Sequence, residues 1–187
     1  MISGLKTIGK TYSIFEGMKG YIPVDLPTKK YIKAYLYSYF NNRPYINRDT
    51  RIGSKLVDLL EHQTNEEKND FSTRYNTNIR LYISGHLFRQ RGVFLNHTNI
   101  KNFNLYVEAV IKERFYELMD DACEVFASFE ANIDGVRLKL GIDDEAWSTD
   151  SMRKDYYRYR KEKGKGLFYK KNVTGFVPSK PLHLYAF

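Results

Sequence analysis

The chain has 187 residues, of which 42% are hydrophobic and 16% aromatic, and it carries a formal net charge of +8. This length suits one ordinary domain or two small ones, and the hydrophobic content excludes a disordered chain and predicts a packed core. Its single cysteine, Cys123, excludes a disulfide framework and a cysteine zinc site within one chain. Neither a hydrophobic leader nor an apolar run of membrane-spanning length is found, which predicts a cytoplasmic protein without a membrane partner.

The positive charge is segmented along the chain. Residues 1–103 carry 16 basic and 8 acidic side chains, residues 104–150 carry 4 and 12, and residues 151–187 carry 10 and 2. An acidic middle between two basic flanks favours a terminal region that faces nucleic acid over a uniformly basic surface.

The first forty residues contain one strong helical signal. Residues 1–20, rich in glycine, are expected to form an extended arm or an irregular strand, and residues 21–24 form a short strand that ends in a proline turn. Residues 27–40 repeat apolar pairs four positions apart, which predicts an amphipathic helix. Residues 41–44, the sequence NNRP, are expected to end it.

The segment up to the middle of the chain mixes helix and strand patterns. Ser54 is expected to cap a second helix, and the polar residues 62–72 to form a loop. Residues 78–84 alternate apolar and polar side chains as a strand does. Residues 85–95 fit either a short helix closed by Gly92 or the second arm of a hairpin.

The clearest periodicity begins at Thr98 and predicts one long helix or two joined ones. This helix is expected to be the spine of the fold, and it can serve a homodimer if part of its stripe is uncovered. Helix is expected to continue over residues 131–140, with Gly141 as its C-cap. The apolar stripe consists of Ile100, Phe103, Val107, Val110, Ile111, Phe115, Leu118, Ala122, Val125, Phe126 and Phe129.

Residues 147–165 form the most basic stretch and predict a further helix. Ser148 or Thr149 is expected to cap it, with Asp150 in the first turn against the helix dipole. Apolar side chains at helical spacing are expected to anchor one face, namely Met152, Tyr156, Tyr159 and the stem of Lys163. The remaining surface carries the candidate DNA-binding residues Arg153, Lys154, Tyr157, Arg158, Arg160, Lys161, Lys163 and Lys165.

The sequence IDDEAWSTDSMRKDYYRYRK, residues 142–161, resembles the C-terminal end of small helix-turn-helix proteins of bacteriophages and mobile elements, of the middle-operon-activator kind. The likeness covers about 30 residues and implies DNA binding by the basic helix, with Arg153 or Tyr157 reaching base edges. Residues 167–171 and 176–177 then read as a hairpin in the position of a wing.

The sequence contains a few short patterns that also occur in catalytic or metal-binding sites. His86 and Arg89 match the His-x-x-Arg element of tyrosine recombinases, but the chain is short for that domain. We instead assign Arg89, Arg91 and His97 to a phosphate-contacting surface. The acidic pairs at 120–121 and 143–145 are ascribed to solvation and helix capping, so we predict no catalytic residue, metal or cofactor.

Together these features predict a mainly α (α+β) fold with a long central helix, a small sheet or hairpin, and a C-terminal helix-turn-helix possibly carrying a wing. Residues 1–97 are expected to form an α+β region and residues 98–187 the long helix and the DNA-binding region. The predicted function is non-catalytic binding of double-stranded DNA by a transcription or replication regulator of a phage or mobile element. The alternative is a virion or replisome assembly protein.

Overall fold

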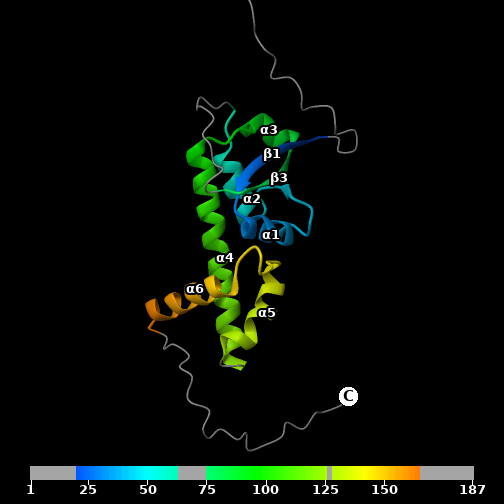
Figure 1. Cartoon of the computed structure of the whole chain (residues 1–187). Helices are drawn as coiled ribbons and strands as arrows, with labels where there is room; N and C mark the ends of the chain where they lie inside the picture. Colours follow the sequence, from blue (N-terminus) through cyan, green and yellow to red (C-terminus); the bar gives the residue numbers. More distant parts are fainter. Residues whose placement is uncertain (1–19, 63–74, 126–127, 165–187) are drawn as a thin grey trace, which may run out of the picture.

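The computed structural model describes residues 20–62, 75–125 and 128–164. This part of the chain contains six helices and a small three-stranded sheet, so the predicted mainly α (α+β) class is confirmed. The long helix α4 (His97–Val125) runs along the whole molecule (Figure 1). The sheet with its helices lies beside one half of α4, and the last two helices lie beside the other half.

The sheet has the strand order β1-β3-β2. Strand β3 (Thr77–Ser84) lies between β1 (Tyr21–Thr28), which is antiparallel to it, and β2 (Tyr45–Ile46), which is parallel. The predicted strand at residues 21–24 therefore runs on to Thr28, and a helix start at Pro27 was wrong. Because β1 is an edge strand, its two prolines, Pro23 and Pro27, need not donate to a second neighbour.

Helix α1 (Lys30–Tyr39) follows β1, and its predicted apolar pairs lie in the core at Ile32, Tyr35 and Leu36. Asn41 and Asn42 take positive φ angles of 51° and 58°, a conformation that asparagine tolerates, and the helix ends there as predicted. The two-residue strand β2, which the sequence reading missed, comes next. Two residues are too few to show the alternation of apolar and polar side chains that identifies a strand in a sequence.

Helices α2 and α3 begin at side-chain caps. The Thr50 hydroxyl accepts a bond from the Gly53 amide and starts α2 (Arg51–Leu59), so the expectation that Ser54 caps this helix was wrong. The Ser84 hydroxyl caps α3 (Gly85–Arg91), which Gly92 closes with a φ of 79°. The helical alternative for residues 85–95 is confirmed and the hairpin alternative was wrong.

The core is continuous from the sheet to the far end of α4. The inward residues of β3 and the predicted stripe of α4 belong to one cluster of buried side chains. The chain turns back after α4, where Ser128 caps α5 (Phe129–Leu140), so the spine is two helices. Gly141 closes α5 with a φ of 67°, as predicted. The buried members of the stripe are Ile100, Phe103, Val107, Ile111, Phe115, Leu118 and, on α5, Phe129.

Two further expectations concern the whole chain. The division at residues 97 and 98 stays a prediction, because buried residues from both sides of that point share one core. A homodimer through α4 also stays a prediction, since elements of the same chain cover most of the apolar stripe.

None of the described helices is both long and apolar enough to span a membrane. The expected arm at residues 1–20 and the expected loop at 62–72, apart from residues 20 and 62, lie outside the described residues, as does the predicted wing at 167–177.

Candidate nucleic-acid interface

The basic helix α6 (Thr149–Glu162) forms where the sequence placed it. The Ser148 hydroxyl accepts a hydrogen bond from the Ser151 amide at 3.4 Å, and Asp150 lies in the first turn. The hydroxyl provides an acceptor for a free backbone N–H at the start of the helix, and the carboxylate interacts favourably with the positive end of the helix dipole. Figure 1 shows α6 extending away from α4 to one side, whereas α5 runs along α4.

Aromatic contacts anchor the apolar side of α6. Met152 and Tyr156 are fully buried, as predicted. The Tyr156 ring meets Phe115 edge-on, with 6.0 Å between centroids, and the Tyr159 ring stacks on Tyr116 at 4.1 Å and an interplanar angle of 7°. Contacts of this kind contribute beyond the apolar area they bury, so this side of α6 is held firmly to α4.

Asp120 of α4 fixes the rotation of α6. Its two carboxylate oxygens accept hydrogen bonds from the hydroxyls of Tyr156 at 2.8 Å and Tyr159 at 2.9 Å. Burial, together with the bond to Asp120, raises the pKa of Tyr156, so its hydroxyl stays protonated and donates. Burial raises the pKa of the stacked Tyr116 to about 12 as well. The sequence reading treated Asp120 as a solvated surface acid, and only the packing of α6 on α4 reveals this role.

Arg137 of α5 fixes the connection that leads into α6. Its Nη2 atom donates to Asp144 Oδ1 at 2.7 Å, to the Trp147 carbonyl at 2.7 Å and to Thr149 Oγ1 at 3.1 Å. Hydrogen bonds from Thr149, with the charge of Arg137, lower the pKa of the Asp144 carboxyl. Arg137 was not predicted, because its partners lie seven to twelve residues further along the chain.

The connection of residues 141–148 is longer than the turn of about three or four residues in a minimal helix-turn-helix. Asp143 accepts a bond from the Ala146 amide at 2.7 Å, so the predicted capping role of this acidic segment is confirmed. Trp147 is buried in the connection and contacts the rings of Tyr31 and Phe115. Helix-turn-helix geometry therefore stays a prediction.

Four of the predicted DNA-binding side chains face solvent. Lys154, Arg158, Lys161 and Lys163 are exposed. The Arg158 side chain is 68% exposed and forms an ion pair with Asp155 at 3.4 Å. Lys165 lies outside the described residues. Lys154, Arg158 and Lys161 lie on the side of α6 away from its anchor, as a groove-binding helix needs, whereas Lys163 lies beside Tyr116 and Tyr159 on the anchored side.

The other three predicted side chains take part in holding α6. Arg153 forms ion pairs with Glu130 of α5 at 3.1 Å and with Asp150 at 3.0 Å, and it lies over the Phe129 ring. A contact between Arg153 and a base edge would have to break these pairs. The ring of Tyr157 meets that of Phe129 edge-on, and Arg160 donates to the Tyr156 hydroxyl at 3.3 Å.

One acid of α6, Asp155, is turned away from solvent and belongs to a series of ion pairs between α6, α4 and Lys29. Asp155 is turned inward, 18% exposed, and pairs with Lys112 at 3.4 Å. Lys112 in turn pairs with Glu108, which Lys29 holds at 2.8 Å. The two lysines outweigh the opposing effect of burial and lower the pKa of the Glu108 carboxyl, so it stays ionised. The acids left on the exposed part of α6 are Asp150 and Glu162.

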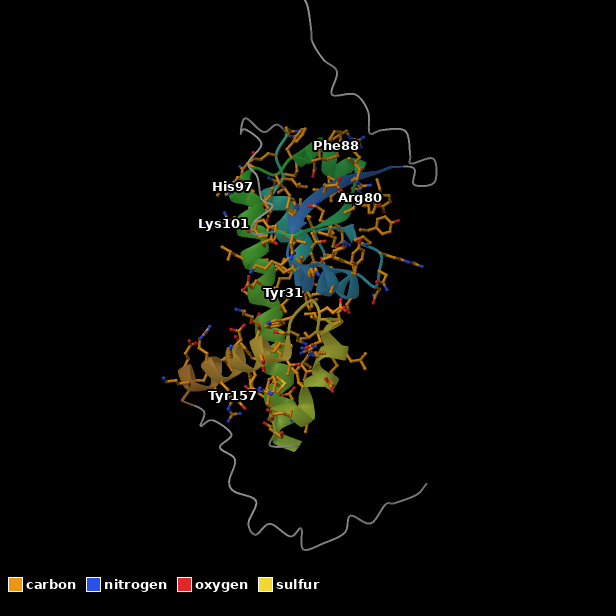
Figure 2. The ribbon with its side chains drawn as sticks, in the orientation of Figure 1. Tyr31, Arg80, Phe88, His97, Lys101 and Tyr157 are labelled. Atoms are coloured by element: carbon orange, nitrogen blue, oxygen red, sulfur yellow. The ribbon has the colours of Figure 1, made fainter. Side chains whose placement is uncertain are left out.

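The second predicted phosphate-contacting surface lies elsewhere. Arg89 and Arg91 project from α3, and they are exposed together with His97 at the start of α4. Figure 2 places His97 near one end of the molecule and Tyr157 of α6 near the other, so the two basic regions do not form one surface. Among the described residues no three His, Cys, Asp or Glu side chains gather as metal ligands would.

No protein-family model matches the chain, and no curated protein or solved structure shows significant similarity to it. The likeness to phage helix-turn-helix proteins therefore stays a prediction.

Proposed function

We propose that the protein binds double-stranded DNA through α6 and acts, without catalysis, as a regulator of transcription or replication in a phage or mobile element. The observation that carries the proposal is the division of α6 into two sides. Tyr156 and Tyr159 are bonded to Asp120 on one side, and Lys154, Arg158 and Lys161 face solvent on the other.

A helix of 14 residues is about 21 Å long and fits the major groove, which is about 12 Å wide. The exposed cations would neutralise phosphates on both walls of the groove and release condensed counterions. Because the opposite side of α6 is buried, binding would need no rearrangement of the helix. The resemblance supplies the biological setting of the proposal, and the geometry supplies its electrostatic mechanism.

The test is a triple variant, Lys154→Ala with Arg158→Ala and Lys161→Ala, measured by fluorescence anisotropy on a labelled duplex over a salt series. Each lost phosphate contact should reduce the slope of log affinity against log salt by about 0.9 and weaken binding to every sequence. The matched control changes Lys101, Arg114 and Lys139 to alanine, which removes the same charge from exposed positions on α4 and α5.

The proposal predicts that the control keeps the salt slope of the wild type apart from a small offset due to net charge. A folded α6 triple variant that binds duplex as tightly as wild type at all salt concentrations would exclude α6 as the binding element. Gel filtration adds a second check: a large homo-oligomer that ignores DNA would favour the assembly role instead.

A further inference from the structure

The outer face of the sheet carries a different set of side chains from the core. The residues of β3 alternate, with Ile79, Leu81 and Ile83 buried and Arg80 and Tyr82 turned outward. Strand pairing places Asp25 opposite Arg80, and Tyr45 of β2 beside Tyr82, on that same outer face. Figure 2 shows Arg80 on the side of the sheet away from α4.

Three tyrosine rings lie in a row across this face. The Tyr21 and Tyr45 centroids are 4.7 Å apart, and those of Tyr45 and Tyr82 are 5.8 Å apart. Tyr21 is 41% exposed. Beside the row is a shallow hollow of about 530 Å³, lined by Tyr37, Tyr45, Tyr82, Arg43 and Arg80. Aromatic rings gathered on the solvent side of a small sheet are not needed for its core.

Cations border the rings. Arg80 is held by two bonds to Asp25, at 2.7 and 3.0 Å, which fix the plane of its guanidinium beside the hollow. Arg43 is exposed, and no ion pair joins it to another described residue. Tyr37 also lines a second hollow, together with Lys30, Lys33, Asp143 and Glu145. Two acids therefore offset the two lysines in that second hollow, and Arg43 supplies the positive charge beside the rings without an ion pair to another described residue.

We propose that this face binds single-stranded nucleic acid, with unpaired bases stacking on Tyr21, Tyr45 and Tyr82 and a phosphate held by Arg43. Every base has a π-face, so a row of rings accepts bases without sequence preference. A duplex keeps its bases inside the stack and cannot use such rings. A proline-rich peptide could also pack on tyrosines, but the bordering cations suit a polyanion better.

This site is independent of the duplex-binding role proposed for α6. The rings lie on the sheet, whereas α6 packs against the opposite half of α4 (Figure 1). Two nucleic-acid surfaces on one rigid spine would let the protein hold a duplex and an adjoining unpaired strand together. Each surface can be removed without touching the other.

The experiment measures binding of labelled oligothymidylate and oligouridylate of about 12 nucleotides, within the span of one single-strand site. Tyr45→Ala and Tyr82→Ala should each weaken binding roughly tenfold, whereas Tyr45→Phe and Tyr82→Phe, which keep the ring, should bind within about twofold of wild type. Tyr39→Ala is the control, because Tyr39 on α1 is 37% exposed, close to the 41% of Tyr21, and does not line the hollow. The same losses should appear in the background of the α6 triple variant.

Two further variants are available if the alanine variants at Tyr45 or Tyr82 fail to fold. Tyr21→Ala changes the most exposed ring of the row, and Arg43→Ala changes an exposed loop residue and should reduce the salt slope by roughly 0.7. The proposal is overturned if wild type binds neither oligonucleotide, if folded ring variants bind as wild type does, or if phenylalanine is as damaging as alanine. Binding of a polyproline peptide in place of either oligonucleotide would also overturn it.

Discussion

Asp120 and Asp121 are adjacent acids with different surroundings. Asp120 accepts bonds from two tyrosine hydroxyls of α6, whereas Asp121 is exposed on α4. The same residue type therefore acts in one position as a structural acceptor and in the next as part of the solvated surface. Arg137 likewise is a buried cation that holds three groups of one connection together. The orientation of α6 depends on these two residues.

Asp120→Ala should lower the free energy of unfolding by about 2 kcal/mol, because two tyrosine hydroxyls lose a charged acceptor. Asp121→Ala should change it by no more than about 0.5 kcal/mol, as exposed substitutions do. Urea denaturation followed by circular dichroism measures both. Equal stabilities for the two variants would show that the hydrogen bonds to Asp120 contribute little.

Helix α5 has one glycine that its end requires and one in its interior that could be replaced. Gly141 ends α5 with a φ of 67°, and a Cβ there would overlap the side chain of Ser38 on α1. Gly135 lies in the middle of the same helix, exposed, and a Cβ there would meet nothing within 4 Å. The glycine at 141 is needed for the close approach of α5 to α1, and the glycine at 135 is not.

The same substitution should therefore have opposite effects at the two positions. Gly141→Ala should destabilise the protein by about 1–3 kcal/mol through backbone strain and overlap with Ser38. Gly135→Ala should stabilise it by about 0.5–1 kcal/mol, because alanine loses less backbone entropy in a helix. The melting temperatures of both variants, compared with that of wild type, measure these changes. A Gly141→Ala variant that melts above wild type would contradict backbone strain and overlap with Ser38 as the cause.

The molecule as a whole is organised by α4, which packs against the sheet region with one half and against α5 and α6 with the other. The buried side chains of both halves form one cluster, and Trp147, the single tryptophan, lies in the connection before α6 and stacks on Tyr31 of α1. A continuous core predicts that the two halves unfold together.

Ile83→Ala, in the sheet half, should cost about 2–5 kcal/mol and shift the unfolding midpoint reported by Trp147 fluorescence as much as that reported by circular dichroism. A fluorescence midpoint that stays at the wild-type value while circular dichroism shifts would show two independently stable regions. That result would support the predicted division at residues 97 and 98.

Periodicity by itself determined most of the helices. The paired apolar residues of α1, the stripe of α4 and the anchored side of α6 can be read from spacing, because a helix with one buried side must repeat about every 3.6 residues. Caps at Ser148 and Gly141 were equally readable, since capping depends on neighbours in the chain.

Only the tertiary structure decided the features that join distant residues. Strand β2, the extension of β1 through Pro27, the hydrogen bonds to Asp120 and the tyrosine row on the sheet all depend on which segments become neighbours in space. Lys154 and Arg153 are adjacent in sequence, yet one faces solvent and the other pairs with Glu130. Local sequence sets the period and the ends of each helix, whereas the partners of a charged or aromatic side chain are set by packing between elements.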